Sequence, residues 1–305
     1  MRVAAIDCGT NSIRLLIADV TGDRLTDVAR RNELVRLGEG VDRTGFLQPA
    51  AIERTRQALL GYAAEIAELG VDRVRMCATS ASRDASNAAD FRAMVRAVLG
   101  VDPEVITGDS EARLSFAGAV NGLVADPPYL IVDIGGGSTE FVTGESEPDS
   151  AISMDIGCVR MTERHLRSDP PTPEEIAAAE RDITAAVDAA LAAVPGRTAG
   201  TLVGLAGSVT TVTALALELP EYDAARIHHA RISYDAVAKV TAELLSATVA
   251  ERLQLPVMHP GRADVIGAGA LILRIIMERA GQSAVVASEH DILDGIAYGL
   301  ADGEA

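Results

Sequence analysis

The sequence predicts an α/β protein made of two similar lobes, and three observations support this fold class. The chain has 305 residues, of which 48% are hydrophobic, so it can form two domains of ordinary size with buried cores. Segments with the pattern of strands alternate with segments that have the apolar spacing of helices. One segment also repeats within the chain. The repeat predicts two lobes built on one plan, with a cleft between them.

The repeated unit is a strand, a tight turn and a second strand. The first copy runs from Val3 to Val20 and the second from Tyr129 to Gly144, and both are rich in β-branched residues. Each turn starts with an aspartate, which is Asp7 in the first copy and Asp133 in the second. In both copies a glycine follows two positions later and a serine five positions later. We expect the two turns to face each other across the cleft.

The remaining elements complete the two lobes. In the first lobe we expect a helix at 49–69, strands at 73–79 and 104–107, and a helix at 110–123. In the second lobe we expect helices at 173–193, 208–219, 235–245 and 262–280 and strands at 201–205 and 284–287. The loop at 126–128 is the predicted boundary. The predicted lobes are therefore residues 1–125 and 126–305.

Composition narrows the classes of function. The formal net charge of −17 is unfavourable for nucleic-acid binding, which requires cations over a broad surface. No apolar run reaches the roughly 18 residues that span a bilayer, and the N-terminus has no cleavable apolar segment. We therefore expect a cytoplasmic protein with no membrane partner. Three widely spaced cysteines predict buried thiols rather than disulfides or a zinc site.

The second turn of the repeat is a candidate phosphate site. The run Gly135-Gly136-Gly137 lacks side chains, so its backbone N–H groups can surround an anion, and Ser138 adds a hydroxyl group. Asp133, at the end of the strand, is placed to hold a hydrated Mg²⁺, which prefers one or two carboxylates, waters and phosphate oxygens. The alternative is a structural turn in which Asp133 is only a cap. Two copies of the motif favour phosphate binding.

A third glycine-containing turn, Gly204 to Thr211, opens a predicted helix. Helix N-termini attract phosphate through free N–H groups and the helix dipole, which makes Gly207 and Ser208 candidate phosphate-binding residues. The alternative is a simple strand-to-helix connection with Ser208 as N-cap. The turn does not have the spacing of a P-loop, and the chain contains no G-x-S-x-G or H-E-x-x-H motif.

With these motifs the sequence resembles the exopolyphosphatase and guanosine pentaphosphate phosphohydrolase family (Ppx/GppA) of the actin, Hsp70 and sugar-kinase superfamily. The resemblance covers almost the whole chain. The strong matches are Asp7–Ile17, Ala78–Asp84, Ile106–Phe116 and Asp133–Glu140, and weaker ones are Asp155–Glu163, Gly204–Thr211, Met258–Asp264 and His290–Ile296. The resemblance implies two ribonuclease H-like lobes, each an actin-like ATPase lobe, with an interlobe cleft.

The resemblance also implies a role for each matched residue. Glu111 falls where the family places the catalytic carboxylate that activates water. Asp133 and Glu140 fall where it places acidic groups for catalysis and metal binding. We expect Asp7 to join this metal site, because Mg²⁺ would offset the repulsion between carboxylates in one cleft. The phosphate would be bound by Asn11, Ser12, Arg83, Gly136, Gly137 and Ser138.

The chain departs from the family pattern at one position. The family usually has two consecutive glutamates, whereas this chain has Ser110 before Glu111. Asp109 restores the charge one position early, but it lies about 100° around the helix and cannot replace the missing carboxylate. We expect the Ser110 hydroxyl to cap free N–H groups at the start of the helix.

The predicted function is hydrolysis of terminal phosphate from inorganic polyphosphate with Mg²⁺. The alternative within the family is a guanosine pentaphosphate (pppGpp) 5′-phosphohydrolase. Two further alternatives are a kinase of the same superfamily and a non-enzymatic sensor that binds nucleotide or polyphosphate. Longer family members carry additional C-terminal domains that this chain lacks, so we expect short polyphosphates to be preferred. The resemblance also predicts a homodimer.

Overall fold

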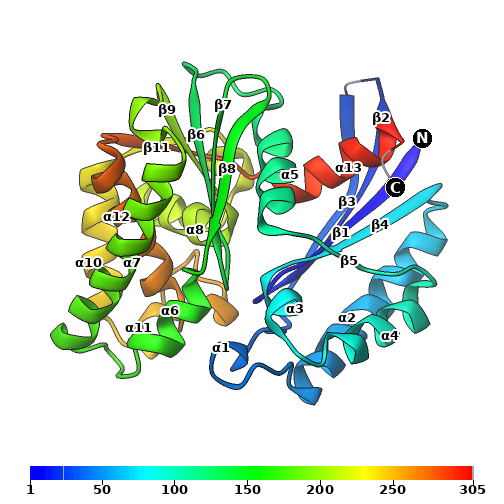
Figure 1. Ribbon diagram of the computed structural model, residues 1–305, viewed down its shortest axis with the longest axis horizontal. Coiled ribbons are helices and arrows are strands. Elements are labelled where there is room, and N and C mark those ends of the chain that lie inside the picture. Colours follow the sequence, from blue (N-terminus) through cyan, green and yellow to red (C-terminus); the bar gives the residue numbers. More distant parts are fainter. Residues whose placement is uncertain (23, 304–305) are drawn as a thin grey trace. The chain divides into compact units, whose positions relative to one another are not determined.

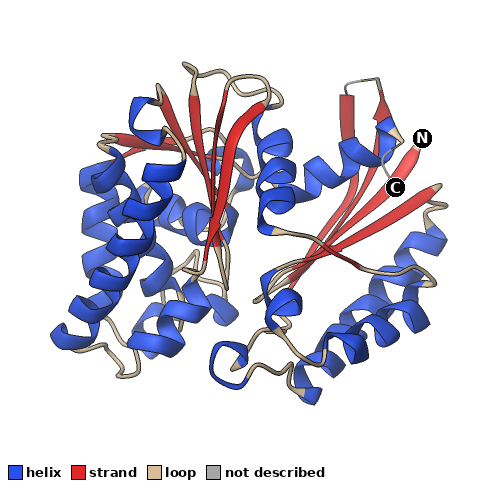
Figure 2. Ribbon diagram, viewed as in Figure 1, coloured by secondary structure: helices blue, strands red, loops and turns tan. Residues whose placement is uncertain are grey.

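The computed structural model describes residues 1–22 and 24–303, and the chain forms two compact units. The first unit comprises Met1–Gly118 and Asp291–Ala305, and the second comprises Ala119–His290. Each unit has one mixed sheet with helices packed against it (Figures 1 and 2). The predicted α/β class is therefore confirmed. The predicted lobes at 1–125 and 126–305 stay a prediction, and the compact units differ from them in assigning the last helix to the first unit.

The first unit has a five-stranded sheet with the order β3-β2-β1-β4-β5. Strands β1, β2 and β3 are antiparallel neighbours, and β4 and β5 run parallel to β1. Side chains on both faces of β1 are buried, which explains its nearly continuous apolar sequence. The strands are β1 (Arg2–Cys8), β2 (Ile13–Thr21), β3 (Arg24–Glu33), β4 (Arg73–Ala78) and β5 (Glu104–Val105).

The second unit has a six-stranded sheet with the order β10-β11-β9-β6-β7-β8. When the order is followed from β8, the first five strands have the same order and relative directions as the strands of the first unit. The repeat found in the sequence is thus a repeat of topology, with β10 as an additional edge strand. The strands are β6 (Tyr129–Ile134), β7 (Thr139–Gly144), β8 (Pro148–Met154), β9 (Thr201–Leu205), β10 (Arg231–Ser233) and β11 (Ala284–Ala287).

Helices cover both faces of the first sheet. On one face, α2 and α4 contribute Leu59 and Phe91 to a cluster that is almost fully buried. On the other face, α13 contributes Ile296 and Leu300, which pack with Val3 of β1. The helices are α1 (Val41–Thr44), α2 (Pro49–Glu68), α3 (Ser80–Asp84), α4 (Ala88–Leu99), α5 (Gly108–Val120) and α13 (Ile292–Asp302).

Helices α5 and α13 touch through their backbones. A Cβ atom at Gly118 would collide with the carbonyl group of Asp291, and one at Gly295 would collide with the carbonyl group of Leu114. Only glycine permits an approach this close. The contact fixes α5, which carries Glu111 in its first turn, against the helix that ends the described chain.

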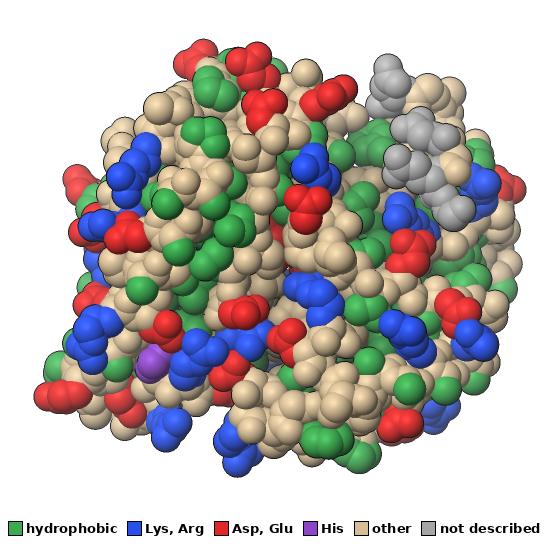
Figure 3. Space-filling view, viewed as in Figure 1, with side chains coloured by type: hydrophobic (Ala, Val, Ile, Leu, Met, Phe, Trp, Pro, Cys, Tyr) green, Lys and Arg blue, Asp and Glu red, His purple; other side chains and the backbone are tan. Residues whose placement is uncertain are grey.

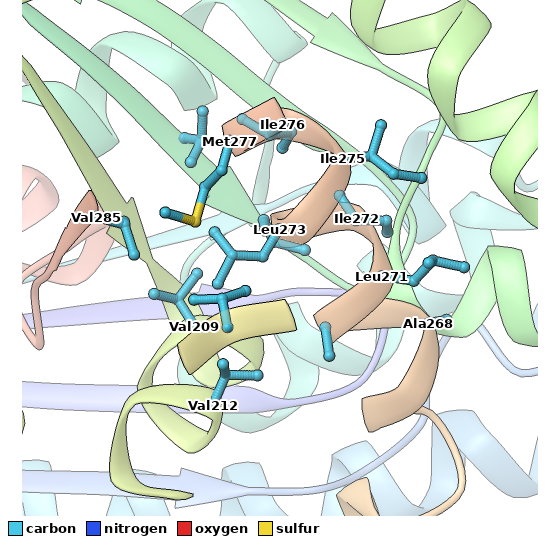
Figure 4. Close-up of a cluster of buried hydrophobic side chains, with 14 of the residues drawn as sticks. Val209, Val212, Ala268, Leu271, Ile272, Leu273, Ile275, Ile276, Met277 and Val285 are labelled. Carbon is cyan, nitrogen blue, oxygen red and sulfur yellow. The ribbon is translucent and has the colours of Figure 1, made fainter. Parts of the chain in front are cut away.

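The second unit has the larger core, centred on α12, whose residues are buried on almost every side. Figure 4 shows Val209 and Val212 of α8 and Val285 of β11 in the cluster around α12. The predicted helix at 262–280 begins later than expected, because residues 260–262 form a short 3₁₀ turn. The helices are α6 (Cys158–His165), α7 (Pro173–Ala193), α8 (Ala206–Ala216), α9 (Ala224–Ile227), α10 (Tyr234–Ser246), α11 (Val249–Arg252) and α12 (Ile266–Ala280).

The surface carries charges of both signs. On the face shown in Figure 3, acidic and basic side chains are interspersed. The three cysteines are buried free thiols, as predicted. None of the helices in the described part of the chain combines the length and apolar character needed to cross a membrane.

Candidate functional site

The first repeat turn lies at the end of β1 and is held by backbone hydrogen bonds. The Gly9 N–H donates to the carbonyl oxygen of Ser12 at 2.9 Å. The N–H groups of Arg36 and Gly38 donate to the carbonyl oxygens of Asn11 and Thr10 at 2.9 and 2.8 Å. The loop after β3 therefore fixes the shape of the turn.

Polar atoms without partners gather around this first turn. They are buried, and the described residues offer them no hydrogen-bond partner: Asp7 Oδ1, Thr10 Oγ1, Asn11 Oδ1 and Ser82 Oγ. Buried polar groups are nearly always paired, and leaving one unpaired costs about 1–3 kcal/mol. Their concentration at one turn indicates a position for a polar ligand, an ion or water. The oxygens of Asp7 and Asn11 accept hydrogen bonds or bind cations, and the predicted roles of both residues stay predictions.

The other oxygen of Asp7 belongs to a buried ion-pair group. Arg14 Nη2 lies 2.7 Å from Asp7 Oδ2, and Arg14 Nη1 contacts Asp291, which caps α13. Burial raises the pKa of Asp7, and Arg14 offsets this only in part. Burial alone would lower the pKa of Arg14, but attraction to Asp291 and Asp7 outweighs it and raises that pKa. Arg14 therefore supplies the positive charge beside Asp7.

Glu111 lies in the first turn of α5, where only 9% of the residue is exposed. Arg83 Nη1 donates to Glu111 Oε2 at 2.7 Å and to the carbonyl oxygen of Ile106 at 3.0 Å. The structure thus brings the predicted base and a predicted phosphate-binding arginine into direct contact.

Ser110 does not cap α5 as expected. The helix begins at Gly108, and the Thr107 hydroxyl accepts the Ser110 N–H at 3.1 Å. The expected cap at Ser110 is therefore wrong, and Thr107, three residues earlier, takes that place. Asp109 pairs with the exposed Arg113 at 2.9 Å. Its carboxylate is therefore held by Arg113.

The second repeat turn has the same backbone closure as the first. The Gly135 N–H donates to the carbonyl oxygen of Ser138 at 3.0 Å. The carbonyl oxygens of Gly135, Gly136 and Gly137 all accept hydrogen bonds from residues 158–160 at the start of α6. Because C=O and N–H of a trans peptide point in opposite directions, the N–H groups of residues 136–138 point away from α6. N–H groups oriented in this way can surround an anion.

Two acidic residues lie opposite each other beside this nest. Asp133 on β6 pairs in register with Glu140 on β7, and the residues are 7% and 1% exposed. The Ser153 hydroxyl donates to Glu140 Oε1 at 2.7 Å. Like charges directly opposite on adjacent strands are destabilising, and burial increases the cost unless a cation lies close by. Two neighbouring carboxylates are one arrangement that can bind a cation.

Asp133 and Glu140 are the kind of donors that Mg²⁺ takes in proteins. Within the described ranges, no group of three or more His, Cys, Asp or Glu side chains could hold a metal ion. Mg²⁺ is usually bound by one or two carboxylates, with waters and phosphate oxygens completing the octahedron. Asp133 and Glu140 match that requirement.

The third turn connects β9 to α8 and is strained. Ala206 has a φ of 68°, a left-handed conformation that is uncommon for residues other than glycine. The Arg262 guanidinium packs directly against Gly207, so closely that a Cβ there would collide with it. Its Nη1 donates to Thr211 Oγ1 at 3.3 Å. A cation over a helix N-terminus attracts anions. Arg262 is not among the predicted site residues, although it lies in a matched motif.

The predicted site residues are divided between the two units. Ser208 is 6% exposed and packs against Gly269, so it has a structural contact as well as a place at the start of α8. The first unit holds Asp7, Asn11, Ser12, Arg83 and Glu111, and the second holds Asp133, Gly136, Gly137, Ser138, Glu140, Gly207 and Ser208.

Comparison with known proteins identifies the family. The Ppx/GppA phosphatase family matches residues 16–304. The chain belongs to this family. It is 52% identical to exopolyphosphatase 2 of Mycobacterium tuberculosis over 314 aligned residues, which cover 98% of each protein. The resemblance seen in the motifs is therefore confirmed.

Solved structures agree with this assignment. A crystal structure of an exopolyphosphatase-like protein is 41% identical and superimposes with a TM-score of 0.96 over 100% of both chains. The Ppx/GppA enzyme of Aquifex aeolicus is 33% identical, with a TM-score of 0.82 over 97% of this chain and 98% of the other. The fold of this chain is that of the Ppx/GppA family.

Proposed function

We propose that this protein is an exopolyphosphatase that releases terminal phosphate from inorganic polyphosphate in the presence of Mg²⁺, with short chains preferred. The observation that carries the proposal is the second repeat turn, where a nest of N–H groups adjoins the buried pair Asp133 and Glu140. An anion site next to a dicarboxylate cation site is the combination that a phosphate–magnesium complex requires. The similar protein from Mycobacterium tuberculosis is named exopolyphosphatase 2, which supports the proposal.

In this proposal each group has one task. The nest at residues 136–138 and the start of α8, with Gly207, Ser208 and Arg262, bind phosphate oxygens. Asp133 and Glu140, together with Asp7, would hold Mg²⁺, which would offset the negative charge of the phosphate chain. Phosphoryl transfer then depends on positioning and charge neutralisation rather than on covalent catalysis.

Glu111 is the proposed general base. Its carboxylate would orient the attacking water and remove its proton, while Asn11 and Ser12 at the first turn bind further phosphate oxygens. The unpaired hydroxyl groups of Thr10 and Ser82 beside that turn can donate to such oxygens. For these tasks both turns must reach the same phosphate chain, and that part of the proposal remains a prediction.

A panel of substrates tests the function. Phosphate release is measured with short polyphosphate, long polyphosphate, pppGpp and ATP, each with and without Mg²⁺. We expect the highest kcat/KM with short polyphosphate and loss of activity when Mg²⁺ is removed. Efficiency that stays equal or rises with chain length would contradict the short-chain preference, and a clear preference for pppGpp would replace polyphosphate as the substrate.

The same assay separates the other classes of function. Capture of phosphate by an added acceptor would indicate a kinase, and binding without hydrolysis would indicate a sensor. We also propose that the protein is a cytoplasmic homodimer, which analytical ultracentrifugation and cell fractionation would test. Sedimentation as a monomer would contradict the proposed dimer without affecting the proposed reaction.

A further inference from the structure

The contact between Arg83 and Glu111 joins three elements at one end of the first sheet. Arg83 lies on α3, which directly follows β4, and Glu111 lies on α5. Nη1 of Arg83 donates both to Glu111 Oε2 at 2.7 Å and to the carbonyl oxygen of Ile106, just after β5, at 3.0 Å. Nη1 carries two N–H groups, and these two acceptors use both of them.

The backbone around this contact is firmly held. The Arg83 N–H donates to the carbonyl oxygen of Thr79 at 3.1 Å, and the Ile106 N–H donates to the carbonyl oxygen of Ala78 at 3.1 Å. The Glu111 N–H donates to Thr107 O at 2.9 Å. The arginine is thus anchored at the ends of two neighbouring strands, and it presents its guanidinium to the carboxylate from a fixed position.

The ion pair between Arg83 and Glu111 is largely buried, so losing it would cost more free energy than losing a surface pair. The side chains of Arg83 and Glu111 are 22% and 12% exposed, so a carboxylate without its partner would be poorly hydrated. Hydrogen bonds between ionised groups are shorter and stronger than neutral ones, and the planar guanidinium restricts their direction. The ion pair therefore restricts the orientation of the Glu111 carboxylate.

We propose that Arg83 is a positioning residue that holds the Glu111 carboxylate in the orientation needed to deprotonate the attacking water. This inference rests on the proposed hydrolase function. It differs from the role that the family resemblance predicts for Arg83, which is direct binding of phosphate. A base displaced by about 1 Å can lose on the order of 10²-fold in rate, so a residue that fixes its position affects kcat more than substrate binding.

Steady-state kinetics of Arg83→Met, Glu111→Gln and the double variant distinguish the two roles. If Arg83 acts through Glu111, Arg83→Met lowers kcat by about 10- to 100-fold and changes KM for short polyphosphate little. The double variant is then no slower than Glu111→Gln alone, because both changes remove one function. A raised KM together with additive losses in the double variant would overturn the proposal and leave Arg83 as a phosphate ligand.

Two further variants supply the controls. Arg83→Lys keeps the charge but lacks the planar guanidinium with its fixed donor directions, so it should recover only part of the kcat that Arg83→Met loses. Arg113→Met removes an arginine from an exposed pair with Asp109 on the same helix as Glu111, and it should leave kcat unchanged. If Arg83→Lys had the parent kcat, or if Arg113→Met lost as much kcat as Arg83→Met, Arg83 would have no specific orienting role.

Unfolding measurements test the contact without any substrate. Thermal unfolding midpoints are compared for the parent, the two single variants and the double variant. If Arg83 holds Glu111, the double variant is less destabilised than the sum of the single variants. Strict additivity would show that the two side chains do not interact, and the proposal would then fail. If the parent releases no phosphate from any substrate, the proposed function fails, whereas this coupling still reports whether Arg83 holds Glu111.

Discussion

At the end of β1, Asp7 lies opposite Arg14, whereas at the end of β6, Asp133 lies opposite Glu140. Both turns otherwise share the same closure, in which the glycine N–H bonds to the serine carbonyl oxygen at 2.9 and 3.0 Å. The two turns therefore differ in the charge of the residue opposite the aspartate, which is positive in the first unit and negative in the second. In the first unit the chain supplies the countercharge itself.

The difference shows how one scaffold can serve two tasks. The first turn is stabilised by the ion-pair group of Asp7, Arg14 and Asp291, which also fixes the start of α13. The second turn places two buried acids side by side, an arrangement that a bound cation would stabilise. We infer that the first unit contributes the base and additional ligands at its turn, and that the second contributes the N–H nest and the buried acidic pair.

The largest expected effect tests this division directly. Glu111→Gln keeps the shape of the side chain but removes the base, so hydrolysis should fall by about 10²–10⁴-fold while substrate binding survives. Asp133→Asn weakens the cation site, so its loss should be partly recovered at high Mg²⁺ concentration. Phosphate release and substrate binding are measured for both variants over a range of Mg²⁺ concentrations.

The Mg²⁺ dependence is the decisive part of this comparison. We expect no recovery of Glu111→Gln at any Mg²⁺ concentration, because its defect is the missing base. Equal recovery of both variants would contradict the assignment of base and cation site to different units. Hydrolysis by Glu111→Gln at the parent rate would instead make Asp109 or Glu140 the candidate base.

The next effect concerns stability. Arg14→Met leaves Asp7 and Asp291 buried without their cation, and breaking a buried ion pair typically costs about 3–5 kcal/mol. Ser153→Ala removes a single hydroxyl hydrogen bond to the Glu140 carboxylate in the other unit and should cost less, about 1.5–3 kcal/mol. Free energies of unfolding from urea titration give both values.

A surface pair provides the control for Arg14→Met. Arg31 on β3 pairs with Glu65, but its side chain is 50% exposed, so Arg31→Met should change the free energy of unfolding by less than about 1 kcal/mol. A loss from Arg14→Met as small as that of Arg31→Met would show that the first turn does not depend on its internal countercharge.

The sequence predicted the features that repeat or alternate. The second strand-turn-strand unit begins at Tyr129 and ends at Gly144 as expected, and the helix at 173–193 and the strands at 201–205 and 284–287 have the expected bounds. These segments are continuous apolar runs, or helices with a clear cap such as Thr172 before α7, so local signals suffice. The two glycine turns were also evident, because aspartate, glycine and serine recur at equal spacing.

Features that depend on distant partners were not evident. Strand β3 is an exposed edge strand with many charged residues, so it lacks the apolar alternation of a half-buried strand. Helix α13 belongs to the first unit through packing that the order of the chain does not reveal. The pairing of Arg14 with Asp291 joins residues far apart in the sequence. The left-handed conformation of Ala206 has no local signal, since alanine does not favour it.

A smaller effect is expected from adding a methyl group to each turn. A Cβ at Gly135 would lie 3.1 Å from the Ser138 carbonyl oxygen, whereas one at Gly9 would lie 3.5 Å from that of Ser12, which is ordinary contact. Gly135→Ala should therefore reduce stability by about 1 kcal/mol and raise KM for polyphosphate, because the nest is distorted. Gly9→Ala should be milder in both measurements. The reverse order would show that the first turn is the more crowded site in solution.

The smallest effect is expected at Ser110, where this chain lacks the second glutamate of the family. Ser110→Glu adds a carboxylate to the first turn of α5, where the helix dipole favours negative charge, and the Thr107 hydroxyl can still accept the backbone N–H of residue 110. The new side chain lies about 100° around the helix from Glu111, so it does not extend toward the same groups. We therefore expect kcat to change by less than about threefold, with Ser110→Ala as the control for loss of the hydroxyl contact to Thr107. If Ser110→Glu, but not Ser110→Ala, raised kcat by much more than about threefold, the missing carboxylate would limit the rate of the enzyme. Residue 110 would then form part of the base site of the first unit.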